Sequence, residues 1–254
     1  MDIINSDIEK YIEYFYAGSS SDLEEFRLIC EDEYVPIIRR ETESFLKGIL
    51  KTAKPKRLLE IGTGAGYSAT VFAKTLRDCQ TPAEDYDNID GCQISDEKYQ
   101  VKDGNYQITT IEMIEKRIQA AKNNFDKYEV TEQIKLLEGD ASEVLKSIVK
   151  NMSGLPNEEL FDFVFIDCAK SRYMEFFTDA LLITSPGAII VCDNVLLGGR
   201  TASDSFITKH REKTSAVKMR NFIDFLKHTG EEIETSLLNI GDGLTVSYLS
   251  EYPL

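Results

Sequence analysis

Short apolar runs alternate with amphipathic stretches from Pro55 to the end of the chain, and this alternation restricts the possible folds more than any other sequence feature. Apolar runs bounded by turn residues predict strands, and an apolar period of about 3.6 residues predicts helices. Strands that alternate with helices favour a doubly wound, mostly parallel α/β sheet. We expect strands over 57–61, 107–112, 134–138, 161–166, 188–192, 234–240 and 244–249, the last two as a hairpin, and helices over 66–77, 140–151, 172–183 and 213–229, with another ending near 127.

Two regions lie outside this alternation. Three helical patterns, "DIEKYIEYFY", "SDLEEFRLICEDE" and "IIRRETESFLKGILKTA", predict a helical extension over 1–54. Residues 78–106 hold eight acidic and two basic residues with little apolar period, which predicts an inserted surface loop or lid. A solvent-exposed loop without function is the simpler interpretation of such a charged segment. The 254 residues suit one domain, 1–254.

Composition limits the function classes. A net charge of −15 and a pI near 4.7 disfavour general binding to nucleic acids, although a local basic patch could still bind phosphates. The first residues lack a signal-peptide pattern, and no apolar run approaches the roughly 20 residues that span a bilayer, so we expect a soluble cytoplasmic protein without a membrane partner. Five scattered cysteines and two histidines, His210 and His228, favour buried reduced thiols over zinc or Ser-His-Asp chemistry.

A glycine-rich turn follows the first expected strand. "LLEIGTGAGYSA" places Gly62, Gly64 and Gly66 between a strand and a helix. Glycines permit positive φ and close approach to a ligand, and a helix N-terminus favours an anionic group. A tight turn without a ligand has the same pattern. The spacing G-x-G-x-G differs from the dinucleotide fingerprint G-x-G-x-x-G, which disfavours a nicotinamide-dependent dehydrogenase.

With Glu60 before it and Tyr67 and Ser68 after it, this turn resembles motif I of the S-adenosylmethionine-dependent methyltransferases. The resemblance implies that these residues and the three glycines lie at the cofactor. It also calls for an acid at the end of the second strand to hold the ribose hydroxyls, and Glu112 stands there, 46 residues after Gly66 because of the insertion. In that fold Asp140 and Ala141 of "LEGDA" border the adenine, although Asp140 can equally be a helix N-cap.

Oxygen ligands end two consecutive strands. Asp167 follows the strand 161–166, and Asp193 and Asn194 follow the strand 188–192. Ligands of open α/β sheets collect at the carboxyl ends of strands, so these groups converge if the two strands are neighbours. Two carboxylates and an amide suit Mg²⁺ or another hard divalent cation. Taken singly, each strand-end acid is more often a loop cap than a ligand.

These motifs together resemble the cation-dependent O-methyltransferases, the family of the catechol and caffeoyl-CoA enzymes. "LLEIGTGAGYS", "FIDCAK", "DNVL" and "IGDGLTVS" follow the family's order, and the resemblance covers about residues 33–250. It implies a Rossmann-like seven-stranded sheet with a reversed last strand, S-adenosylmethionine as methyl donor and commonly a homodimer. It further implies metal binding by Asp167, Asp193 and Asn194, and catalytic roles for Asp167 and Lys170.

The implied chemistry is consistent. Methyl transfer requires an acceptor oxygen in line with the sulfonium methyl group. A cation that binds two neighbouring substrate oxygens orients them and lowers the pKa of the acceptor hydroxyl. Lys170 would then accept the proton or stabilise the oxyanion, and a solvated lysine is the alternative. Asp167 lies close enough to this centre to be counted with the cofactor residues as well.

One branch of the family resembles the chain more closely, the bacterial tRNA 5-hydroxyuridine methyltransferases. The shared features are "VPI" (35–37), with Val35 expected at the cofactor, "DNVLLGG", "IGDGL" and a basic tract. That tract contains His210 and six cations that would bind RNA phosphates: Arg200, Lys209, Arg211, Lys213, Lys218 and Arg220. A solvated helix face is the alternative interpretation.

Methylation of wobble 5-hydroxyuridine to 5-methoxyuridine is therefore the leading hypothesis from sequence, because its hydroxyl and carbonyl form a vicinal oxygen pair. A small catechol-like acceptor is the second hypothesis. A non-catalytic protein that binds a nucleotide-like ligand is the third.

Overall fold

The computed structural model describes residues 6–16, 22–79 and 106–250. Most of the predicted insertion, 80–105, lies outside the described residues. The helices are α1 (Ser6–Tyr16), α2 (Asp22–Asp32), α3 (Arg40–Ala53), α4 (Tyr67–Asp78), α5 (Glu115–Lys127), α6 (Ala141–Met152), α7 (Tyr173–Leu181) and α8 (His210–Lys227). The strands are β1 (Arg57–Ile61), β2 (Gln107–Glu112), β3 (Ile134–Glu138), β4 (Phe161–Ile166), β5 (Thr184–Cys192), β6 (Ile233–Leu238) and β7 (Leu244–Leu249).

The seven strands form one sheet in the order β3-β2-β1-β4-β5-β7-β6. The pairs from β3 to β5 are parallel, whereas β7 is antiparallel to both of its neighbours. The predicted mostly parallel sheet with a reversed last strand is thus confirmed. Strand order reverses between β1 and β4, and ligands of doubly wound sheets bind at such a switch point.

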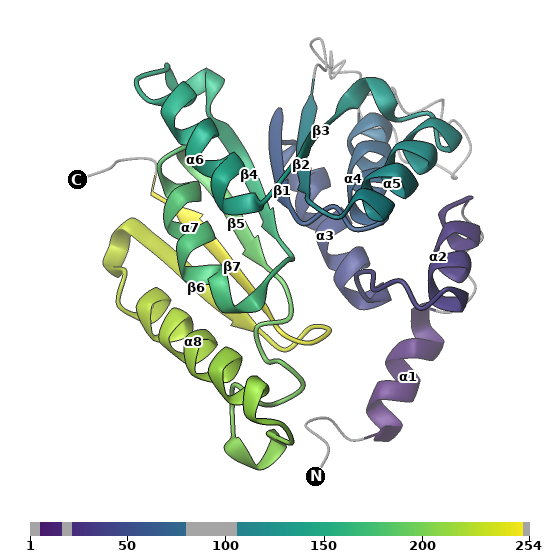
Figure 1. The fold of residues 1–254 in the computed structure, drawn as a ribbon, viewed down its shortest axis with the longest axis vertical. Helices are drawn as coiled ribbons and strands as arrows, with labels where there is room; N and C mark the ends of the chain where they lie inside the picture. Colours follow the sequence, from purple (N-terminus) through teal and green to yellow (C-terminus); the bar gives the residue numbers. More distant parts are fainter. Residues whose placement is uncertain (1–5, 17–21, 80–105, 251–254) are drawn as a thin grey trace, which may run out of the picture.

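Helices cover both faces of the sheet, α3, α4 and α5 on one face and α6, α7 and α8 on the other (Figure 1). The alternation of side chains along β4 shows why. Phe163 and Phe165 point into the core beneath α3 and α4, while Val164 and Ile166 point into the core beneath α7 and α8. A strand buried on both faces is apolar along its buried length, which explains the run "FVFI" after Asp162, the one polar and only partly buried residue of β4.

Several element boundaries differ from those predicted. β5 begins at Thr184 rather than 188, and a register irregularity between Phe161 and Phe163 accommodates its early part. β6 ends at Leu238 instead of 240, because the residues that follow turn back into β7 with positive φ at Gly241 and Gly243. α8 begins three residues earlier than predicted, at His210.

The N-terminal helices lie beside the α4 face. The Phe26 ring of α2 contacts the ring of Tyr67 at 5.1 Å and stacks on Tyr128 at 4.9 Å between centroids. α1 extends away from the sheet (Figure 1). Beyond the insertion, the Tyr106 hydroxyl donates a hydrogen bond to the Ala73 carbonyl at 2.6 Å. Among the described helices, none has the length and apolar content needed to cross a membrane.

Candidate functional site

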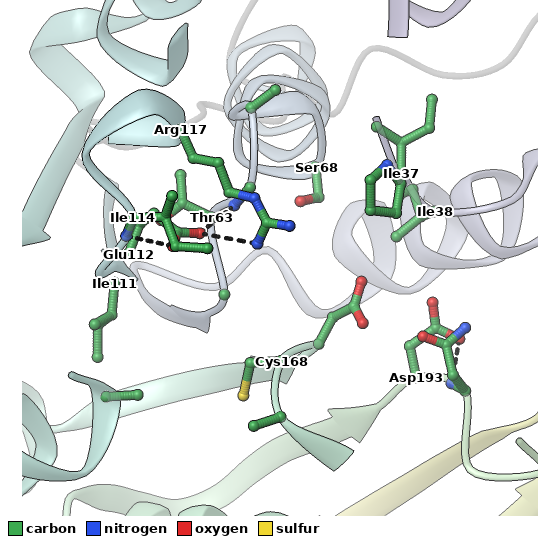
Figure 2. Close-up of a pocket in the computed structure, with 18 of the residues that line it drawn as sticks. Ile37, Ile38, Thr63, Ser68, Ile111, Glu112, Ile114, Arg117, Cys168 and Asp193 are labelled. Carbon is green, nitrogen blue, oxygen red and sulfur yellow. Dashed lines mark hydrogen bonds and ion pairs between the residues drawn. The ribbon is translucent and has the colours of Figure 1, made fainter. Parts of the chain in front are cut away.

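A cavity of about 550 Å³ opens at the carboxyl ends of the strands, beside the switch point. Its walls come from the segment 35–39, the glycine turn, and the residues that follow β2, β3, β4 and β5. Figure 2 shows Glu112 and Arg117 on one side, Ile37, Ile38 and Asp193 on the opposite side, and Ser68 between them. Nine of the residues predicted for the cofactor line this cavity: Val35, Gly62, Gly64, Tyr67, Ser68, Glu112, Asp140, Ala141 and Asp167.

The three glycines of the turn have different neighbours. All have positive φ, but a Cβ on Gly62 would lie 2.2 Å from the main-chain oxygen of Asp167. A Cβ on Gly66 would lie 2.6 Å from Cε1 of Phe125 on α5. A Cβ on Gly64 would meet nothing within 4 Å. The expectation of ligand approach at Gly66 is therefore corrected: this glycine lets α4 pack against α5, and it does not line the cavity.

Main-chain N–H groups hold the Glu112 carboxylate beside the glycine turn. Its Oε2 accepts a hydrogen bond from the Gly64 N–H at 3.0 Å, and its Oε1 accepts from the N–H groups of Met113 and Ile114 at 2.9 Å. The Arg117 guanidinium lies 3.9 Å from Oε2. The carboxylate is thus oriented before any ligand binds, it lines the cavity, and Oε2 has capacity for a further hydrogen bond.

Glu60 is the other prediction that the structure corrects. Its side chain is fully buried below the turn and accepts hydrogen bonds from the hydroxyls of Ser68 and Thr110. Burial raises the pKa of Glu60 to about 8, and the negative charges of Asp167 and Glu112 act in the same direction. Because it lies beneath the cavity rather than in its wall, Glu60 orients Ser68 and does not itself face a ligand.

Asp140 is the helix N-cap that the sequence allowed, and it also lies at the cavity. Its Oδ1 accepts from the Ser142 N–H at 3.0 Å, which makes it the N-cap of α6. Its carboxylate also lines the cavity, where Arg172 contacts both oxygens at 3.1 and 3.2 Å. The sequence analysis did not select Arg172, because only the fold brings it from the loop after β4 to the loop after β3.

The predicted oxygen ligands converge. β4 and β5 are neighbours, with Ile166 paired to Cys192, so Asp167 and Asp193 follow at the same edge of the sheet. Asp193 is buried, and its Oδ1 accepts from the Asn194 N–H at 2.6 Å. The pKa of Asp193 is raised to about 7, chiefly by burial and also by the negative charge of Asp167.

Lys170 lies beside the Asp167 carboxylate. Its Nζ contacts the Asp167 carboxylate and donates to the Tyr173 hydroxyl at 3.0 Å. The Tyr173 oxygen is in turn 2.8 Å from the main-chain oxygen of Asp193. A buried carboxylate beside a second one fits a divalent cation, because the cation would balance the charge that burial leaves unfavourable. In the described part of the chain no three His, Cys, Asp or Glu side chains form a metal cluster.

The cavity also contains residues that the sequence analysis missed. Asp242, from the turn between β6 and β7, lines it and accepts from the Gly198 N–H at 2.6 Å. Arg117 and Arg39 line it as well. Of these, only Asp242 had a sequence signal, since it belongs to the quoted motif "IGDGL".

The basic tract lies elsewhere, on α8 and the loop before it, and none of its six predicted RNA-binding residues lines the cavity as described. Arg220 binds the carbonyls of Arg200 and Thr201 and pairs with Asp204 at 2.6 Å, which makes it a structural residue of that loop. Arg200 lies 3.8 Å from Glu212. The other four predicted residues are exposed: Lys209, Arg211, Lys213 and Lys218.

Known proteins that are similar to this chain are O-methyltransferases. A family model described as O-methyltransferase matches residues 98–249, more than half of the chain. A catechol O-methyltransferase of Niastella koreensis is 29% identical over 63% of this chain, and the match spans 59% of that relative. A caffeoyl-CoA O-methyltransferase of Populus kitakamiensis is 27% identical over 91% of this chain and 87% of its own. An SAH-bound Podospora anserina methyltransferase superposes with a TM-score of 0.74 at 24% identity, over 98% of both chains.

Proposed function

The chain belongs to the O-methyltransferase family, and from this premise we propose that it transfers a methyl group from S-adenosylmethionine to one oxygen of a small molecule with two vicinal oxygens. We propose Mg²⁺ or a similar hard divalent cation as its metal. Because the chain belongs to a family of enzymes, we no longer retain the hypothesis of a non-catalytic binding protein. The observation that carries the proposal is the placement of Asp167 and Asp193, after paired strands, in the same cavity as the glycine turn and Glu112.

The chain's residues divide the cavity between donor and acceptor. Oε2 of Glu112 suits a ribose hydroxyl, and Asp140 and Ala141 lie where the adenine would bind. Binding of SAH by the Podospora anserina neighbour supports this assignment of the donor. At the other end, Asp167, Asp193 and Asn194 would hold the cation, which when bound lowers the pKa of an acceptor hydroxyl.

The transfer is a displacement at carbon. The acceptor oxygen bonds to the methyl carbon, the carbon–sulfur bond breaks, and the sulfur keeps the electron pair. The hydroxyl proton leaves, and Lys170 is the basic side chain placed at the carboxylates. Lys170→Arg retains the charge but cannot lose a proton at neutral pH, so a kcat retained by this variant would assign Lys170 an electrostatic role, whereas a lost kcat would assign it as the base.

The proposal is tested with Asp193→Asn and the acceptor catechol. We expect the variant to lose at least about a hundredfold in kcat/KM, because a buried ligand charge is removed, and we expect EDTA to abolish wild-type activity until Mg²⁺ is restored. Asp126→Asn, an exposed aspartate on α5, is the matched control and should behave as wild type. Methylated product is measured by mass spectrometry. Full activity in EDTA would rule out the metal, and absence of any catechol product would rule out the acceptor class.

A tRNA acceptor is a second candidate, favoured by the exposed cations of α8. We expect wild-type enzyme to form 5-methoxyuridine in hydroxyuridine-containing tRNA if this candidate holds. Combined replacement of Lys209, Arg211 and Lys213 by Gln would then lower tRNA methylation severalfold without changing catechol methylation, since the replaced charges lie outside the cavity. Nucleoside mass spectrometry without 5-methoxyuridine would eliminate it.

Two further predictions concern assembly, from the resemblance, and location, from the sequence pattern. The homodimer is a proposal that light scattering of the purified chain tests directly. Cytoplasmic location stays a prediction from the sequence pattern.

A further inference from the structure

A second cavity, of about 950 Å³, lies beside the first, and the two share the segment 35–39 as a wall. We call it the α1 cavity, because α1 provides much of the remaining lining, together with Arg27 and Glu31 of α2, the beginning of α3 and the turn 239–241. Asp242, the next residue of that turn, lines the first cavity. The α1 cavity therefore adjoins the proposed active site along one loop segment and one turn.

The turn also connects the α1 cavity to the metal-ligand end of the active site. Val195 N–H donates to the Gly243 carbonyl at 3.0 Å, and Leu196 N–H donates to the Asp242 carbonyl at 2.9 Å. These bonds follow directly after Asn194. An acceptor whose two oxygens lie at Asp167 and Asp193 would consequently have the turn, and the α1 cavity behind it, close to the rest of its body.

The lining of the α1 cavity is mainly apolar. α1 provides Tyr11, Ile12, Phe15 and Tyr16, and the opposite wall includes Ile37, Phe45 and Ile240. Tyr11 and Phe15 are 71% and 72% exposed. Neighbouring large apolar side chains that a fold leaves exposed around a hollow are typical of a binding site.

Two of the arginines in this lining are already paired with glutamates. Arg27 donates to Glu43 at 2.7 Å, and Arg40 makes two bonds to Glu24, at 2.6 and 2.7 Å. Glu31 and Glu41 also line the cavity. Little positive charge is left for a polyphosphate chain, so the α1 cavity suits a neutral group.

We infer that the α1 cavity binds the neutral apolar body of the acceptor. The substrate class is an amphipathic small molecule, with a vicinal dioxygen head at Asp167 and Asp193 and an aliphatic or aromatic body against α1. The inference rests on the proposed function for the placement of the head. A cavity of this volume holds a drug-sized molecule, whereas catechol itself would occupy only the head position.

The test compares catechol with 4-hexylcatechol. A fully buried methylene contributes about fourfold to affinity, so six that are partly buried should raise kcat/KM by about a hundredfold over catechol. Phe15→Ala should reduce this ratio by about tenfold. Tyr14→Ala is the control: Tyr14 lies on the same helix, is 77% exposed and does not line the cavity, so its ratio should remain that of wild type. Both replaced side chains are largely exposed, so neither variant should unfold.

Calorimetry of 4-hexylcatechol with enzyme, SAH and Mg²⁺ gives a second readout that needs no turnover. Binding weakened about tenfold by Phe15→Ala and unaffected by Tyr14→Ala supports the inference even if no catechol is methylated, in which case the proposed function alone fails. Equal kcat/KM for both acceptors, with catechol methylated, overturns the inference and leaves the proposed function standing. A dimer by light scattering that Phe15→Ala dissociates, with no gain from the hexyl chain, overturns it in favour of a second copy covering α1.

Discussion

At the scale of single residues, the surroundings of a residue decide the role that residues of the same chemical type have. Gly62, Gly64 and Gly66 belong to one motif, yet the first accommodates the main chain after β4, the second faces open space in the cavity and the third accommodates α5. Of the two buried acids Glu60 and Asp193, the first is satisfied by two hydroxyls and the second lies beside another carboxylate. The first accordingly supports the site from below, and the second is suited to a cation.

Alanine substitutions should separate the glycines. Gly62→Ala places a methyl group against a main-chain oxygen that cannot move independently, so we expect a loss of about 3 kcal/mol or more in the free energy of unfolding. Gly64→Ala incurs only the left-handed backbone strain, about 1–2 kcal/mol. Urea unfolding measures both. Equal losses would contradict the assigned neighbours.

The pH dependence of stability should carry a contribution from Glu60. Its pKa is raised from 4.5 to about 8, so between these values the folded state holds a proton that the unfolded state has lost. That contribution is fully present below pH 4.5 and is lost as the pH rises through 8. Glu60→Gln should therefore flatten the decline in unfolding free energy between pH 5 and pH 8. Urea unfolding in EDTA checks this, and parallel pH curves for the two proteins would refute it.

At the scale of elements, one arginine fastens the N-terminal helices to the sheet. Arg27 of α2 is 3% exposed and donates to the Ile38 carbonyl at 2.9 Å and to Glu43 of α3 at 2.7 Å. Its guanidinium also lies 4.9 Å from the ring centroid of Tyr67, whose hydroxyl donates to Glu43. The segment 35–39 that separates the two cavities is thus held by α2, α3 and the start of α4 together.

Removing this arginine should cost more than removing a similar, less buried one. Arg27→Met leaves the Ile38 carbonyl without its arginine donor and the Glu43 carboxylate with the Tyr67 hydroxyl but without a buried positive charge, so we expect a loss of about 3–5 kcal/mol in the free energy of unfolding. Arg40→Met breaks the pair with Glu24, whose side chains are each 22% exposed, and should cost about 1 kcal/mol. Urea unfolding compares the two, and a smaller cost for Arg27→Met would contradict the role assigned to it.

At the scale of the whole molecule, charge and fold act separately. The net charge of −15 opposes the compact state by self-repulsion, while the sheet and its two layers of helices place the site at the strand ends whatever the surface charge. The net negative charge of the chain therefore says little about the reaction. It says more about how the chain behaves in solution.

Salt should stabilise this chain. Raising NaCl from 10 to 150 mM at pH 7 shortens the screening length from about 30 Å to about 8 Å and weakens the repulsion among the excess negative charges. We expect the thermal unfolding midpoint to rise, and scanning calorimetry in EDTA measures it without metal binding. A falling midpoint would mean that the surface ion pairs outweigh the repulsion.

The sequence by itself determined the elements and the chemistry available at their ends. Apolar periods predicted seven strands and most helices, the glycine spacing separated methyltransferase from dehydrogenase, and acids after two apolar runs predicted Asp167 and Asp193 at a common edge. These signals are local, since each depends on residues close together in the chain. Only the tertiary structure paired β4 with β5, moved Glu60 and Gly66 out of the cavity wall, added Arg172 and Asp242 to it and opened the α1 cavity beside it. Those outcomes depend on which distant segments pack together, and no periodicity within one segment encodes its neighbour.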